Sequence, residues 1–247
     1  MHYLPFILPA LVGGFVQSTT GFGCGIIIMM FYPALLGVLP SATISECASI
    51  FLTFSIIIRY RKHANLKKVI LPLLFYFPVY LLFLQIAASI NVDFLKPILG
   101  LFLIVMSIYF IFAAGKISIK ATPKTAFICA ALSAMADAFF GIGGPPIVLY
   151  FLSTTENKEE YFANVQMMFF TTSTYGALMR IWKGILTPIL IPNIAIAVIS
   201  IAVGTIFGHR VADRLDGELL KKLVYVLVGI AGMITFITNL DVLLLLF

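Results

Sequence analysis

Long apolar stretches separated by short polar loops run along almost the whole chain, and most have the length of a membrane span. A helix needs about 20 apolar residues to cross the hydrocarbon core of a bilayer. The pattern predicts three ordinary spans in each half of the chain. These are Ala42–Ile58, Val69–Ile90 and Pro97–Ala114 in the first half, and Phe162–Met179, Ile185–Phe207 and Leu223 to about Leu243 in the second. The expected fold is an all-α integral membrane protein.

Each half opens with an apolar stretch that a glycine-rich centre interrupts. The first, Tyr3–Leu39, holds 37 residues. As one helix it would be roughly 55 Å long, against a hydrocarbon core of about 30 Å. Its arms, Tyr3–Val16 and Ile26–Leu39, are too short to cross alone but long enough to pass the midplane. We therefore expect a re-entrant helical hairpin with a glycine tip inside the membrane. Two short tilted spans are the alternative that these lengths leave open.

The two halves repeat one pattern. An offset of 120 residues brings Gly21–Gly25 onto Gly141–Pro145, and a later match needs an insertion of about five residues in the second half. The same offset pairs Gln17 with Asp137, Glu46 with Gln166, Thr53 with Ser173 and Pro72 with Pro192. We predict two homologous repeats within one transmembrane domain, residues 1–114 and 125–247, joined by a cytoplasmic linker at 115–124.

Composition and charge agree with a multi-pass protein of the cell (cytoplasmic) membrane. Hydrophobic residues make up 62% of the 247 positions and charged residues 11%, against roughly a quarter charged in soluble domains. The chain opens without the charged start and cleavage site of a signal peptide, so we expect its first residues to belong to the mature protein. The net charge of +6 arises mostly from loop lysines and arginines. Such loops report membrane orientation, and they give no support for nucleic-acid binding.

The basic residues also indicate how the halves are oriented, because lysine and arginine concentrate in cytoplasmic loops. Re-entrant hairpins leave three crossings in each half, so the second half is inverted relative to the first. Of the 16 basic residues, 13 then lie in cytoplasmic loops and only Lys96, Arg180 and Lys183 lie outside. If each broken stretch crosses once, the division becomes 10 and 6. The charge pattern favours inverted repeats.

The glycine breaks are the expected binding site. A broken helix at membrane depth is tolerated where it is buried in protein or lines a watery cavity, and matched breaks in two halves indicate a midplane substrate site. The helices that follow the breaks would direct their N-termini to the centre, where they stabilise an anion without any lysine or arginine. The simpler alternative is that the glycines only let helices pack closely.

The run from Gly14 to Gly25 and its counterpart from Phe140 to Pro146 resemble the two signature loops of the sulfite exporter TauE/SafE family. The resemblance covers essentially the whole chain. It implies transport of a small sulfur-containing anion such as sulfite, thiosulfate or an organosulfonate. The family's glycine loops correspond to Gly21, Gly23, Gly25, Gly141, Gly143 and Gly144. Cys24 and Pro145 depart from all-glycine runs, which leaves the identity of the anion open.

Polar residues at membrane depth are costly and are functional candidates. Asp137 lies four residues before Gly141, and Glu46 begins the next span. We expect one of these acids to take up a proton that couples transport or neutralises the site. The alternatives are that Glu46 lies at the lipid boundary and that Asp137 only helps helices to pack. The candidate anion-binding set is Gln17, Thr19, Thr20, Gln166 and Cys24 together with the six glycines above.

Other functions have weaker support. The sequence holds no H-E-x-x-H, no G-x-S-x-G and no paired aspartates at membrane depth, so we expect no enzyme, no metal site and no cofactor. A carrier or channel for another small anion, such as a short carboxylate, is the main alternative within transport. The expected partners are the anion and the lipid bilayer, and the sequence leaves homo-oligomer formation open.

Overall fold

The computed structural model describes residues 3–112, 120, 122–211 and 217–244, and within this part of the chain every regular element is a helix. The helices are α1 (Leu4–Thr20), α2 (Cys24–Phe31), α3 (Pro33–Leu36), α4 (Val38–Tyr60), η1 (Arg61–His63), α5 (Leu66–Ser89), α6 (Val92–Phe112), α7 (Pro123–Phe140), α8 (Gly144–Thr154), α9 (Lys158–Trp182), η2 (Pro188–Leu190), α10 (Ile191–Val211), α11 (Gly217–Thr238) and α12 (Leu240–Leu244). Most of the expected linker at 115–124 lies outside the described residues.

Four stretches of the described chain are long and apolar enough to cross a membrane. They are Val38–His63, Leu66–Ser89, Asp93–Phe112 and Pro188–Arg210. Many large apolar side chains on these helices are exposed, among them Phe51, Leu74, Leu101 and Ile199. Such a surface is stable in lipid and not in water. The all-α membrane class predicted from the apolar pattern is therefore confirmed.

Both glycine-rich apolar stretches are interrupted at their glycines. In the first stretch, the arm before the glycines is longer than expected, because α1 continues to Thr20, and the arm after them is not one helix. Instead of one arm over Ile26–Leu39, the chain forms the eight-residue helix α2, the short helix α3 and the start of α4 at Val38. Pro33 and Gly37 explain the difference, since proline opens a new helix and Gly37 has a φ of 83°.

The helix boundaries of the two halves correspond. An offset of 120 residues relates the end of α1 to the end of α7, the start of α2 to that of α8, and the start of α4 to that of α9. For the starts of α6 and α11 the offset is 125 residues. The most extensive contacts pair α1 with α10, α5 with α7, α4 with α9, and α6 with α11. α1 corresponds to α7, α5 to α10, α4 to α9 and α6 to α11. Replacing each helix by its counterpart therefore converts the α1–α10 pair into the α7–α5 pair and leaves the α4–α9 and α6–α11 pairs unchanged.

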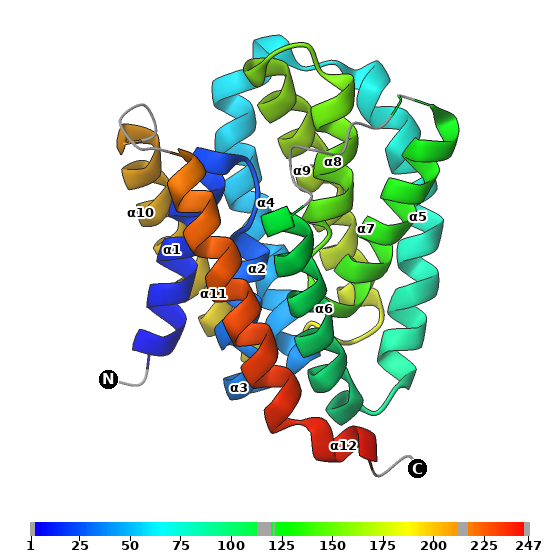
Figure 1. The fold of residues 1–247 in the computed structure, drawn as a ribbon, viewed down its shortest axis with the longest axis vertical. Helices are drawn as coiled ribbons and strands as arrows, with labels where there is room; N and C mark the ends of the chain where they lie inside the picture. Colours follow the sequence, from blue (N-terminus) through cyan, green and yellow to red (C-terminus); the bar gives the residue numbers. More distant parts are fainter. Residues whose placement is uncertain (1–2, 113–119, 121, 212–216, 245–247) are drawn as a thin grey trace.

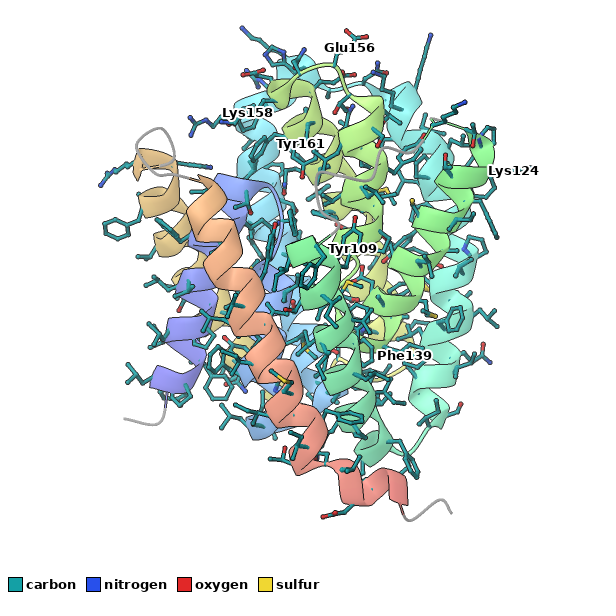
Figure 2. All side chains as sticks on the ribbon, in the orientation of Figure 1. Tyr109, Lys124, Phe139, Glu156, Lys158 and Tyr161 are labelled. Atoms are coloured by element: carbon teal, nitrogen blue, oxygen red, sulfur yellow. The ribbon has the colours of Figure 1, made fainter. Side chains whose placement is uncertain are left out.

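Corresponding helices run in opposite directions in Figure 1. α4 and α6 ascend in the view, whereas α9 and α11 descend, and both chain termini lie at the lower end. The α1–α2 hairpin starts from the lower end and α7–α8 from the upper end. Lys124 and Lys158, labelled in Figure 2, lie at the upper end, away from the termini. The loop between α4 and α5, which carries Arg61 and Lys62, lies there too.

Candidate functional site

The helices α1 and α7 each end at a glycine in the left-handed backbone conformation. Gly21 has a φ of 90° and Gly23 a φ of 112°, and Gly141 has a φ of 62°. The N–H of Gly21 donates to the Gln17 carbonyl at 2.8 Å, and that of Gly141 to the Asp137 carbonyl at 2.7 Å. Glycine adopts this conformation at little cost, so the chain can leave one helix and start the next within three residues.

The two tips meet at α4. A Cβ atom built on Gly25 would lie 2.6 Å from the Gly141 carbonyl oxygen, and one on Gly141 would lie 2.9 Å from the Ala42 carbonyl oxygen. A side chain at Gly25 would push the two hairpins apart, and one at Gly141 would push the second tip away from α4. The glycines therefore allow two segments from different halves of the chain to touch deep inside the protein.

A cavity of about 50 Å³ lies between the tips. A water molecule needs roughly 10–15 Å³ by this measure, so the space suits a few waters or one small ion. Its lining combines both tips with α4, α5, α7 and α9: Gln17, Phe22, Gly23, Gly25, Ile26, Ser49, Tyr76, Ser133, Asp137, Gly141, Ile142, Gly143, Gly144, Pro145, Ile147, Met168, Phe169, Thr172 and Ser173. No lysine or arginine is among them, and Asp137 is the single carboxylic acid.

Asp137 and Gln17 both lie at the start of the second arms. The Asp137 carboxylate accepts a hydrogen bond from the Tyr76 hydroxyl and lies against Gly143, just before α8, where an added Cβ would be 2.8 Å from Asp137 Oδ2. The Gln17 side-chain oxygen accepts from the N–H of Cys24, the first residue of α2, at 3.2 Å. Both side chains are buried. In each half, a polar side chain four residues before the glycines occupies the positive end of the following helix.

Gln166 connects the first tip to α9. Its amide nitrogen donates to the Gly21 carbonyl at 2.5 Å, and its oxygen accepts from the Gln17 amide at 3.3 Å. Gln166 is fully buried. An unpaired amide would be costly at this depth, so the pair holds the first tip against the second half of the chain.

A charged network lies beside the second tip. Arg180 Nε lies 2.8 Å from Glu46 Oε2, and the Tyr80 hydroxyl donates to Glu46 Oε1 at 2.7 Å. Arg180 Nη2 donates to the carbonyls of Asp137 and Ala138 at 3.2 and 2.9 Å. The last carbonyls of a helix have no partner within it, and here the guanidinium supplies one.

The location of Arg180 corrects the expectation that it lies in an outside loop. α9 extends through Trp182 rather than ending at Met179, and Arg180 has no exposed surface. Gly176, one turn earlier, makes room for its partners: a Cβ there would lie 2.5 Å from Glu46 Oε2 and 2.7 Å from the Tyr80 oxygen.

Of the thirteen expected site residues, seven line the cavity and six do not. Gln17, Gly23, Gly25, Asp137, Gly141, Gly143 and Gly144 line it. Gln166, Gly21 and Glu46 belong to the adjoining networks. Thr19 and Thr20 bond with their hydroxyls to nearby backbone carbonyls. The Cys24 sulfur packs behind the first tip, 2.9 Å from where a Cβ of Gly13 would stand.

The sequence reading missed the tyrosines, the arginine and the serine of this region. Tyr76 and Tyr80 are four residues apart on α5 and stack with ring centroids 5.6 Å apart. An arginine flanked by Met179 and Ile181 was one available signal, because a charge inside an apolar run needs a buried partner. Ser133 gave no signal, since serine is common in membrane helices.

Comparison with known proteins agrees with a membrane transport protein. The family model described as sulfite exporter TauE/SafE matches residues 6–235, so the chain belongs to this family of transporters. A curated relative from Cupriavidus necator, the probable sulfite/organosulfonate exporter TauE, is 25% identical over 242 residues, which cover 93% of each chain. No solved structure gives a significant match. The resemblance noted from the glycine loops is thus confirmed.

Proposed function

We propose that this protein is a secondary transporter that moves a small sulfur-containing anion, such as sulfite, thiosulfate or an organosulfonate, across the cytoplasmic membrane. The observation that carries the proposal is the cavity between the two glycine tips, at the N-termini of α2 and α8. Helix N-termini favour anions, and sites of this kind occur in transporters with broken helices. The name of the curated relative supports the sulfur-containing class.

The proposed mechanism is alternating access by two inverted repeats. Matching helix boundaries, contacts that exchange between the halves and opposite helix directions support the repeats. In such folds one bundle moves against the other around a fixed site. The basic end of the molecule would face the cytoplasm, because Lys124, Lys158 and the segment between α4 and α5 with Arg61 and Lys62 lie there.

Proton coupling at Asp137 follows from the charges around the cavity. Glu46 and Arg180 form a buried ion pair, so their charges compensate each other. Asp137 lines the cavity, and its carboxylate accepts its hydrogen bond from the Tyr76 hydroxyl rather than from a cation. An ionised Asp137 would repel an anion a few ångströms away. We therefore assign the proton to Asp137 and give Glu46 the role of holding Arg180.

A binding screen tests the substrate class. Purified protein in detergent is heated with sulfite, thiosulfate, sulfate, short sulfonates and short carboxylates, because ligands of the native state raise its apparent stability. Stabilisation by sulfite, thiosulfate or a sulfonate supports the proposal. Stabilisation by carboxylates alone would instead establish the alternative carrier or channel for another small anion.

A further inference from the structure

One buried tyrosine bonds directly to the acid that is proposed to carry the proton. Tyr76, on α5, is 1% exposed and lines the cavity, and its hydroxyl donates to Asp137 Oδ2. Among the described residues, no other side chain donates a hydrogen bond to this carboxylate. A hydrogen bond to the ionised form of a carboxyl group stabilises that form. Tyr76 therefore acts on the charge state of Asp137.

The other ionisable groups around Asp137 make their hydrogen bonds elsewhere. The Tyr80 hydroxyl donates to Glu46. Arg180 pairs with Glu46 and donates to the backbone carbonyl of Asp137, not to its side chain. The Arg180 charge also acts on Asp137 over a longer range, but the Glu46 charge beside it opposes this effect. The direct side-chain contact with the carboxylate is left to Tyr76.

The packing of the Tyr76 ring holds its hydroxyl in place. The ring stacks on that of Tyr80, with centroids 5.6 Å apart and an interplanar angle of 20°, and it meets the ring of Phe77 edge-on at 6.3 Å. All three residues belong to α5, which packs along α7, the helix of Asp137. A phenylalanine would keep these ring contacts and lose only the hydrogen bond.

The related contact between α1 and α10 carries no acid. At the offset of 120 residues, Ile196 corresponds to Tyr76 and Gln17 to Asp137. Neither isoleucine nor glutamine takes up a proton in this pH range, and the Gln17 amide donates to Gln166 instead. The pair of hydroxyl and carboxylate therefore occurs at the second tip and not at its counterpart.

We propose that Tyr76 is a positioning residue for proton uptake: its hydroxyl orients the Asp137 carboxylate beside the cavity and sets the pH range over which this carboxylate is protonated. In the proposed function, on which this role rests, Asp137 carries the coupling proton. Because Oδ2 accepts from Tyr76, Oδ1 is the oxygen that takes the proton. The protonated carboxyl group is then a hydrogen-bond donor and no longer repels an anion.

Infrared titration of the purified protein tests this role without requiring transport. The carbonyl stretch of the protonated Asp137 carboxyl group is identified by its loss in Asp137→Asn, and its intensity is followed against pH. In Tyr76→Phe the midpoint should rise by about one pH unit, as for loss of a hydrogen bond to a charged group. Tyr76→Leu also lacks the hydroxyl and should show the same rise, which guards against a folding defect of one variant.

Tyr80→Phe is the matched control. Tyr80 is as deeply buried as Tyr76 and lies one turn further along α5, but it donates to Glu46 and does not line the cavity. Removal of its hydroxyl should leave the midpoint of the Asp137 titration near that of the wild type.

Uptake of radiolabelled sulfite by proteoliposomes gives a second readout. Each variant is compared with the wild type at the same pH, so that the titration of sulfite itself cancels in the ratio. Tyr76→Phe should retain uptake to higher pH than the wild type, because its Asp137 stays protonated there. In the double variant Tyr76→Phe/Asp137→Asn the pH profile should match that of Asp137→Asn alone.

The outcomes separate this role from the proposed function. A midpoint that rises without the Tyr76 hydroxyl and stays unchanged in Tyr80→Phe supports the role. A midpoint that is unchanged in Tyr76→Phe, or that rises equally in Tyr80→Phe, would overturn it and leave the transport function intact. Titrations as expected in a protein that takes up no sulfur-containing anion would instead refute the transport function. A wild-type Asp137 that shows no titration would overturn both its proton assignment and the role of Tyr76.

Discussion

Arg180 and Glu46 form an ion pair between α9 and α4, with 2.8 Å between Nε and Oε2 and side chains that are 0% and 2% exposed. The pair joins residues far apart in the sequence and also holds the carbonyls at the end of α7. It therefore connects the second glycine tip to both central helices. Its role is structural support of the tip, which is distinct from the role proposed for Asp137.

Removing Arg180 should destabilise the protein strongly. Arg180→Gln leaves the Glu46 carboxylate buried without its cation, a change that costs roughly 3–5 kcal/mol for buried pairs. Thermal unfolding in detergent measures the effect, with the exposed Arg61→Gln as control. In the double variant Glu46→Gln/Arg180→Gln the loss should be smaller than the sum of the single losses. An Arg180→Gln protein that melts with the wild type would contradict this role.

Asp137→Asn should abolish the pH dependence of transport while the protein still binds its anion. The asparagine keeps the shape of the site but carries neither a charge nor a titratable proton. Uptake into proteoliposomes at several pH values is the measurement, and Glu46→Gln is the comparison, since Glu46 does not line the cavity. A pH profile that is unchanged in Asp137→Asn would remove Asp137 from the coupling.

Two glycines of the tips should respond differently to alanine. Gly25→Ala places a methyl group 2.6 Å from the Gly141 carbonyl oxygen, so we expect destabilisation of about 1–3 kcal/mol, as for overpacking. Gly144→Ala meets nothing closer than 3.5 Å and should fold normally. Its methyl group narrows the cavity, so transport should fall while the melting temperature stays near that of the wild type. Equal melting temperatures for the two variants would contradict the contact between the tips.

The basic end of the molecule offers a pH test on stability. Lys68 Nζ lies 2.8 Å from Glu160 Oε1, and the Glu156 N–H donates to Glu160 Oε2 at 2.9 Å. Burial alone would raise the pKa of the Glu160 carboxyl, but these hydrogen bonds and the Lys68 charge outweigh it and lower the pKa below its usual value.

Because the folded pKa of Glu160 is the lower one, its contribution is present above the unfolded pKa of about 4.3 and is lost as the pH falls through the folded pKa. Glu160→Gln should therefore reduce stability at pH 7 by up to about 1 kcal/mol and match the wild type at low pH. Melting temperatures across this range check the sign. A difference that grows on acidification would contradict it.

The helical architecture could be read from the sequence because lipid imposes simple rules. Apolar stretches of span length gave the membrane class, and the repeated glycine runs gave the places where α1 and α7 end. The short helices α2 and α3 were missed because Pro33 and Gly37 lie within an apolar run, where hydropathy does not register a helix break. Boundaries elsewhere differ by up to six residues: α4 and α9 extend beyond their apolar stretches, whereas α10 begins at Ile191 instead of Ile185, after the 3₁₀ turn Pro188–Leu190.

The candidate site was less accessible to sequence reasoning. Gln17, Asp137 and the glycines could be found because they recur at one offset. Arg180, Tyr76, Tyr80 and Ser133 have no similar residue at that offset, since they occur in one half only. Their partners come from helices remote in sequence, and only packing brings these together.

Uptake of radiolabelled sulfite by proteoliposomes that contain the purified protein, with and without an imposed pH gradient, tests the proposed transport function. In the wild type we predict saturable uptake above that of empty liposomes, and faster uptake with the gradient, whereas in Asp137→Asn the gradient should make no difference. Uptake of sulfite, thiosulfate and short sulfonates no faster than in empty liposomes would show that the protein does not transport a small sulfur-containing anion.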